Sequence, residues 1–188
     1  MSKENNHLSD KTIVTNILNG NIQSFAIVVK NTEKLVAQIV RKMTNNEDDQ
    51  KDLMQDIYLK AYQNLSSFQF KSKLSTWIAN IAYNTTVNYL QKKKIPIMEI
   101  EKTMENKFKV TENPELETIK TETVEILHAE VAKLPPLYKT LITLYHLEEL
   151  PNKEISEITN LPEGTIKSYL YRARKILKDN IHYHYKNK

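Results

Sequence analysis

The sequence of 188 residues predicts an all-α protein, and three observations lead to that class. Apolar residues return at intervals of three and four along most of the chain, which is the period of an amphipathic helix. Only two glycines occur, Gly20 and Gly164, too few for a turn-rich β fold or a glycine-rich phosphate loop. Cysteine is absent, which excludes disulfides and cysteine-ligated zinc. We therefore expect helices held together by side-chain packing.

The N-terminal half predicts four helices, each with an apolar stripe. They cover residues 13–18, about 22–43, from the polar 45–49 stretch to Leu65, and 74–85. Gly20 provides a stop after the first helix, and the Asn and Asp side chains at 45–49 can cap the first turn of the third. A short loop, residues 66–73, separates the last two helices. These four segments predict one compact helical unit.

Residues 91–115 lose the helical period and contain Pro96 and Pro114, which predicts a linker. The period returns at about Glu115. Further helices are expected over about 115–134, from Pro136 to Tyr145, over 152–159, and from about Pro162 to Leu177. The expected organisation is therefore two small helical domains, residues 1–94 and 115–188, joined by a flexible linker at 95–114.

The last two predicted helices form a helix-turn-helix. Residues 160–162 make a three-residue turn, and Asn160 suits it because Asn tolerates the left-handed conformation. Ile166, Leu170 and Leu177 face inward, so the opposite side of the helix is polar. That side carries the candidate DNA contacts, Thr165, Lys167, Ser168, Tyr171, Arg172 and Lys175. The alternative is an ordinary helical hairpin with a basic face.

The net charge of +4 is distributed unevenly. Residues 99–130 are mainly acidic, whereas residues 167–188 are mainly basic, and a second basic group lies at 71–73 and 92–94. A single basic run is usually a solvated face. Two such groups, each beside a helix, favour a nucleic-acid partner.

Other classes of function lack a matching pattern. No apolar stretch approaches the roughly 18 residues of a membrane span, and the polar N-terminus lacks the apolar core of a signal peptide. We therefore expect a cytoplasmic protein with no membrane insertion. The five histidines are scattered, and no carboxylate pair stands out for acid-base chemistry. We expect no metal, no cofactor and no enzymatic activity.

Three motifs carry a resemblance to a known family. They are DLMQDIYLKAY (52–62), STWIANIAYNT (75–85) and GTIKSYLYRAR (164–174). Residues 49–94 resemble region 2, and residues 134–178 resemble region 4, of the extracytoplasmic-function (ECF) sigma factors of bacterial RNA polymerase. With the helices from Thr12 to Met43, the resemblance covers most of the chain. It implies a factor that binds core polymerase, recognises −35 and −10 promoter elements and helps to melt DNA.

The resemblance also implies partners and the residues that contact them. The expected partners are promoter DNA and core RNA polymerase, through the coiled coil of its largest subunit and its flap region. An anti-sigma factor is a further family expectation. Candidate polymerase contacts are Asp52, Leu53, Gln55 and Asp56. Alternatively, the two aspartates favour the N-terminal half of a helix electrostatically; both roles are compatible.

The resemblance places the −10 contacts on the 66–73 loop and the helix after it. The candidates are Phe68, Phe70, Lys71, Lys73, Trp77, Asn84 and Asn88. Aromatic faces can stack with unpaired bases, lysines can neutralise phosphates, and amides can pair with base edges. The helical spacing of Trp77 with Leu74, Ile78 and Ile81 also fits a core residue. Asn84 and Asn88 also fit solvent-facing polar residues.

In region 4, the family comparison selects Lys167, Ser168, Tyr171 and Arg172 as −35 contacts. The sequence departs from the family pattern at Tyr169, where many relatives have a basic residue, and this removes a possible phosphate contact. Two alternative functions remain at this level. One is a free-standing helix-turn-helix regulator, against which the DLMQDIYLKAY motif argues. The other is a helical scaffold without salt-dependent affinity for DNA.

Overall fold

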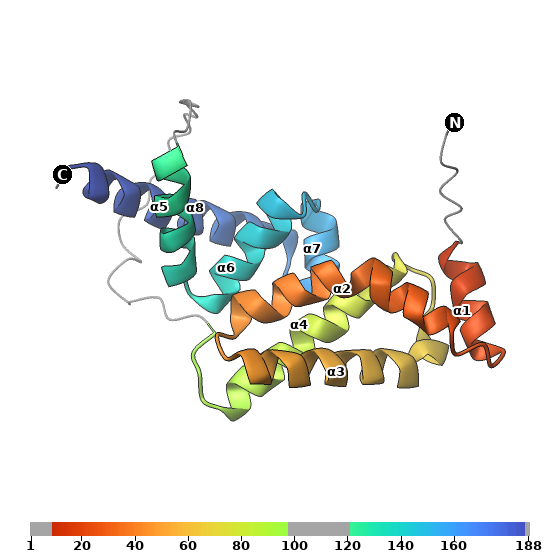
Figure 1. Ribbon diagram of the computed structural model, residues 1–188. Coiled ribbons are helices and arrows are strands. Elements are labelled where there is room, and N and C mark those ends of the chain that lie inside the picture. Colours follow the sequence, from red (N-terminus) through yellow and green to blue (C-terminus); the bar gives the residue numbers. More distant parts are fainter. Residues whose placement is uncertain (1–8, 98–120, 187–188) are drawn as a thin grey trace, which may run out of the picture.

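The structure is a computed structural model that describes residues 9–97 and 121–186. Within these ranges every regular element is helical and there is no strand, so the all-α prediction is confirmed (Figure 1). None of the helices described is both long enough and apolar enough to span a membrane.

The N-terminal unit has the four predicted helices. They are α1 (Asp10–Leu18), α2 (Ser24–Met43), α3 (Glu47–Gln63) and α4 (Leu74–Lys92), with a 3₁₀ turn at Leu65–Ser67. Gly20 has a φ of 95°, which allows the chain to turn after α1. At the start of α3, Asn46 Oδ1 accepts a hydrogen bond from Asp49 N at 2.9 Å. The predicted stop at Gly20 and the predicted cap before α3 are therefore both confirmed.

The C-terminal unit contains α5 (Thr121–Lys133), α6 (Pro136–Ile142), α7 (Asn152–Thr159) and α8 (Glu163–Lys186). Pro135 and Pro136 separate α5 from α6, as expected of residues that cannot donate a backbone hydrogen bond. The predicted helix from Pro136 to Tyr145 is not uniformly α-helical, because Thr143–Leu147 forms a π-helical segment. The bounds predicted for α7 are confirmed.

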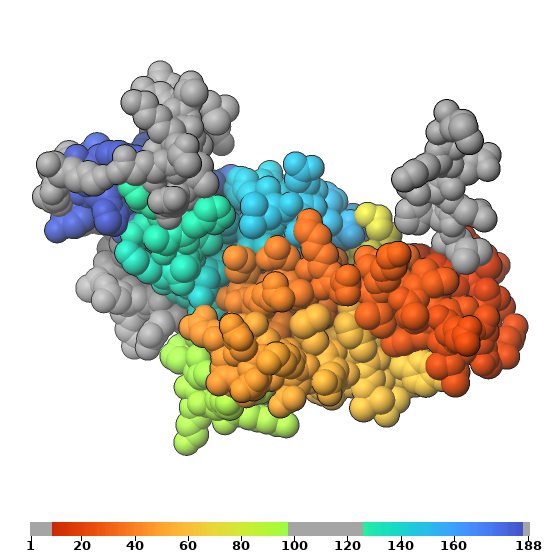
Figure 2. Space-filling view, viewed as in Figure 1, coloured from red at the N-terminus to blue at the C-terminus, as the bar shows by residue number. Residues whose placement is uncertain are grey.

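The two units pack against each other in the structure. α4 packs on α2 and α3 within its own unit and on α7 of the other, while α6 packs on α2. In the space-filling view, the C-terminal helices rest directly on α2 (Figure 2). Ile78, Ala79 and Ala82 of α4 have no exposed surface. The core is therefore continuous across both units.

Most of the predicted linker lies outside the described residues, and the domain boundaries remain a prediction. Its first residues, 95–97, follow α4 closely. Ile97 packs against the core, and its carbonyl oxygen accepts a hydrogen bond from Leu137 N at 3.2 Å. The start of the predicted linker thus docks on α6.

The cap of α3 can be tested with adjacent asparagines. We expect Asn46→Ala to lower the free energy of unfolding by about 1 kcal/mol, because an amide of the first turn loses its acceptor. Chemical denaturation would measure the change. Asn45→Ala is the control, since Asn45 is exposed and precedes the capping position. Equal losses in the two variants would contradict a capping role.

Candidate nucleic-acid interface

The helix-turn-helix consists of α7, a three-residue turn and α8. Asn160 adopts the predicted left-handed conformation, with φ 58° and ψ 20°, and its N–H donates to Ser156 O at 2.8 Å. Ser156 Oγ donates to Leu161 O at 2.6 Å, which ties the turn back to α7. Ile166 and Leu170 are buried, so this face of α8 fixes the helix to the unit.

The opposite face of α8 carries the six predicted DNA contacts. Lys167, Ser168 and Arg172 are exposed, whereas Thr165, Tyr171 and Lys175 are half-buried. Cationic and hydroxyl groups therefore lie on the accessible side of the second helix of the motif. This arrangement suits insertion into a major groove, where such groups bind phosphates and base edges.

The loop before α4 differs from its prediction in the position of one aromatic ring. Phe68 is only 6% exposed and lies beside Phe70 and Trp77, with ring-centroid distances of 4.7 and 5.4 Å. Its ring is therefore not available to a base in this conformation. Phe70 is 47% exposed, and Lys71 and Lys73 are exposed. Trp77 is half-buried: one part of its ring packs against the core, and the other part is accessible to a base.

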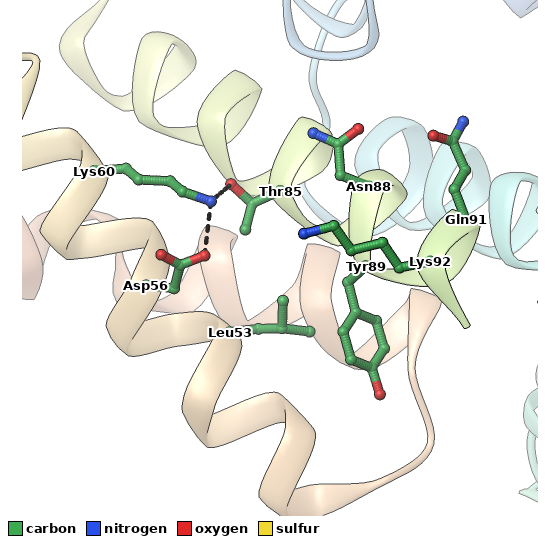
Figure 3. A pocket seen from close by; sticks show the side chains of 8 residues that line it. All are labelled: Leu53, Asp56, Lys60, Thr85, Asn88, Tyr89, Gln91 and Lys92. Atoms are coloured by element: carbon green, nitrogen blue, oxygen red, sulfur yellow. Dashed lines mark hydrogen bonds and ion pairs between the residues drawn. The ribbon is translucent and has the colours of Figure 1, made fainter. Parts of the chain in front are cut away.

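Two pockets lie along α4. The first, of about 540 Å³, lies between α3 and α4 and is shown in Figure 3. Lys60 Nζ donates to Asp56 Oδ2 on the same helix at 2.7 Å and to Thr85 Oγ1 of α4 at 3.4 Å. The second, of about 460 Å³, is lined by Trp77 and four asparagines, which are Asn64, Asn80, Asn84 and Asn88. Lys60, Asn64 and Asn80 were not predicted, although Asn80, Asn84 and Asn88 follow one another at helical spacing.

The four predicted polymerase contacts do not share one environment. Asp52 and Gln55 are exposed on α3, Asp56 is paired with Lys60, and Leu53 is 6% exposed and belongs to the core. Only Asp52 and Gln55 present their side chains fully to a partner. Among the described residues, no group of three or more metal-binding side chains occurs.

Comparison with known proteins identifies the family. Residues 28–95 match the family described as Sigma-70 region 2, and residues 125–177 match Sigma-70, region 4. The chain is 31% identical to the ECF RNA polymerase sigma-E factor of Haemophilus influenzae over 182 residues, which covers 93% of this chain and 96% of the relative. The chain belongs to the ECF sigma factors.

Other relatives span this sigma factor equally well. It is 30% identical to the sigma-E factor of Escherichia coli K12, over 93% of this chain and 95% of the relative. It is 29% identical to the ECF sigma factor SigW of Bacillus subtilis, over 91% and 96% of the two chains. As a sigma factor with regions 2 and 4, the chain binds core RNA polymerase and directs transcription initiation at promoters.

Solved structures share the fold of this sigma factor. CnrH in complex with the cytosolic domain of CnrY aligns with a TM-score of 0.63 and 17% identity, covering 90% of this chain and 95% of CnrH. RpoE of Bartonella quintana in complex with the anti-sigma factor NepR aligns with a TM-score of 0.63 and 19% identity, covering 85% and 98%. At these identities the likeness concerns the fold.

The atypical Tyr169 of this sigma factor faces the packed interior between the units. Its ring lies 5.7 Å from that of Tyr138 on α6. It also lies close enough to Tyr83 on α4 for the two phenols to interact electrostatically. Burial, with a smaller contribution from Tyr169, raises the pKa of Tyr83 to about 12. Sequence patterns within region 4 gave no sign of this contact with α4.

The raised pKa of Tyr83 makes this packing measurable. An unfolded tyrosine titrates near pH 10, so the folded state favours the neutral phenol. The resulting stabilisation is complete below about pH 10 and declines as the pH rises toward 12. The test compares the tyrosinate absorbance of the parent and of Tyr83→Phe as the pH is raised. We expect the difference between the two curves, which belongs to Tyr83, to appear near pH 12. A difference between the two curves centred near pH 10 would instead show that the Tyr83 phenol is solvated.

Proposed function

We propose that the exposed face of α8 reads the −35 element of promoters recognised by this sigma factor. The observation that carries the proposal is the helix-turn-helix itself, in which the second helix leaves Lys167, Ser168 and Arg172 exposed. Thr165, Tyr171 and Lys175 border these residues and complete the contact surface. Arg and Lys suit guanine edges and phosphates, and Ser suits either.

We also propose that α4 and the loop before it hold the melted −10 strand. The asparagine-lined pocket supports this role, because a carboxamide can donate to and accept from a base edge. Phe70 offers an exposed ring for stacking, and Lys71 offers a cation for the phosphates. Asn84 and Asn88 are the base-reading candidates, and Trp77 forms part of the pocket wall.

For polymerase, we propose a single face of α3 that binds the coiled coil of the largest subunit. Asp52, Gln55, Leu59 and Tyr62 are spaced by three or four residues and all are exposed, with Leu59 at 55% and Tyr62 at 39%. A carboxylate beside uncovered apolar side chains suits a partner helix of mixed character. Leu53, which is buried, then supports this face from beneath, and Asp56 borders it. Region 4 would contact the flap.

The cellular location and an inhibitory partner of this sigma factor are also proposals. We propose a non-catalytic factor that acts in the cytoplasm, where bacterial polymerase and DNA are found. The structural neighbours CnrH and RpoE were solved with CnrY and with the anti-sigma factor NepR. An anti-sigma partner of this chain is proposed by analogy with RpoE.

Run-off transcription with core polymerase on a genomic library tests the proposed promoter contacts. We expect defined start sites, and Arg172→Ala should reduce their use about tenfold because a base or phosphate contact is lost. Arg174→Ala is the matched control, since Arg174 is exposed on the same helix but lies near His146 and is not one of the six proposed contacts. Equal effects of the two variants, or no start site with any template, would contradict the proposal.

The polymerase-binding face can be tested with two exposed acidic residues of α3. We expect Asp52→Asn to weaken binding of core polymerase about tenfold, because a charge-assisted contact is lost. Glu47→Gln is the control, since Glu47 is exposed at the start of α3 and lies five residues from Asp52, on another side of the helix. Fluorescence anisotropy of labelled sigma factor would measure both affinities. Unchanged binding by Asp52→Asn would exclude that residue from the interface.

A further inference from the structure

Two helices with DNA-binding assignments contact each other in this structure. α7, the first helix of the helix-turn-helix, packs along α4, which carries the proposed −10 contacts (Figure 1). The contact is made by specific polar groups as well as by apolar packing. These groups include Asn84, which the proposed function assigns to DNA, and Lys73, a −10 candidate from the sequence.

Glu154 of α7 is the central polar group of this contact. Its carboxylate is 10% exposed, and both oxygens are bound by the other unit. Oε1 accepts from Thr76 Oγ1 at 2.6 Å, and Oε2 accepts from Lys73 Nζ at 2.9 Å. A carboxylate is costly to bury without partners. Glu154 therefore has its bonding satisfied while α7 lies on α4, and the Lys73 ammonium is paired with it.

The end of α7 is bound by an asparagine network from α4. Asn80 Nδ2 donates to Glu157 O and Ile158 O, each at 2.9 Å, which satisfies carbonyls near the helix terminus. Asn84 Nδ2 donates to Asn80 Oδ1 at 3.0 Å, while Asn84 Oδ1 accepts from Asn160 Nδ2 at 3.4 Å. Asn84 is thus held in the network through both its amide nitrogen and its oxygen, which fixes the orientation of a side chain that a base edge would need.

We propose that α7 is an internal competitor of single-stranded DNA for the α4 surface. In the free sigma factor, this closed arrangement holds the Lys73 ammonium in an ion pair and Asn84 in the network with α7, and the units must separate before a melted −10 strand can bind. The exposed face of α8 is not covered by the same contact, since Lys167, Ser168 and Arg172 remain exposed. The competition with DNA rests on the proposed −10 role of α4. The packing of α7 on α4 is independent of that role.

Several features make the closed arrangement displaceable. Lys73 is 68% exposed, and the second ion pair between the units joins Glu148 to Lys34, which is 73% exposed. The lysine of each pair is therefore open to water and to a competing anion. Lys139 of α6 is half-buried and lies near Lys42 of α2. The two positive charges therefore repel each other across the contact between the units. These features favour displacement of α7 by a ligand that binds α4.

Distance measurements between paired spin labels test the closed arrangement. The chain has no cysteine, so Asn45→Cys and Lys178→Cys place one label on each unit at exposed positions. In this background we expect one narrow distance distribution. Glu154→Gln should broaden it toward longer distances, because the charge bound by Lys73 and Thr76 is lost. Glu157→Gln removes the same charge from an exposed position of α7 and should change nothing.

DNA binding provides the second measurement. We expect Glu154→Gln to bind a fluorescent pool of random single-stranded DNA about tenfold more tightly than the parent, with Glu157→Gln unchanged. Affinity for duplex DNA carrying a −35 element should stay the same, because the exposed face of α8 is not masked. Thr76→Val removes the donor from the other side of the contact, and it should change both measurements in the same direction as Glu154→Gln.

Three outcomes would overturn the proposal. A broad distance distribution in the parent would show that the units are already separate. An unchanged distribution in both Glu154→Gln and Thr76→Val would show that these bonds do not hold the units together. Separation without a gain in single-stranded DNA binding would overturn the competition with DNA and would count against α4 as the DNA surface, while leaving the contact itself established.

Discussion

The packing of α4 between α2, α3 and α7 is the constraint on which the rest of the structure depends. A helix with neighbours on three sides has little surface left for solvent, and Ala79 and Ala82 keep its own side chains small where neighbours approach. The same helix supplies the asparagines of the second pocket and the partners of Glu154. Folding, proposed DNA contact and contact between the units therefore share one element.

Local features of the fold were readable from the sequence because they arise from neighbouring residues. The bounds of α7, the left-handed Asn160 and the break at Pro135 each follow from period or backbone sterics. The recognised motifs likewise supplied the family. Side-chain orientation in the 66–73 loop did not follow, since no period applies there, and Phe68 turned inward against Trp77.

The contact between the units was beyond sequence reasoning. Glu154 and Glu157 are acidic residues three positions apart on one short helix, and nothing local distinguishes them. One is buried against Thr76, which lies 78 positions away, and the other is exposed. From the sequence of region 4, Tyr169 is only a position without the expected cation. Its position near Tyr138 and Tyr83 gives a physical reason, because a charge there would be costly to bury.

The placement of α7 on α4 within one polypeptide has a consequence for dosage. An inhibitor on a separate chain can be titrated, so its effect changes with the relative abundance of the two proteins. The contact between Glu154 and Thr76 is intramolecular, and its occupancy is independent of how much sigma factor the cell makes. Raising expression would increase the number of closed molecules and open molecules in the same ratio. A change in that ratio requires a ligand that prefers one of the two forms.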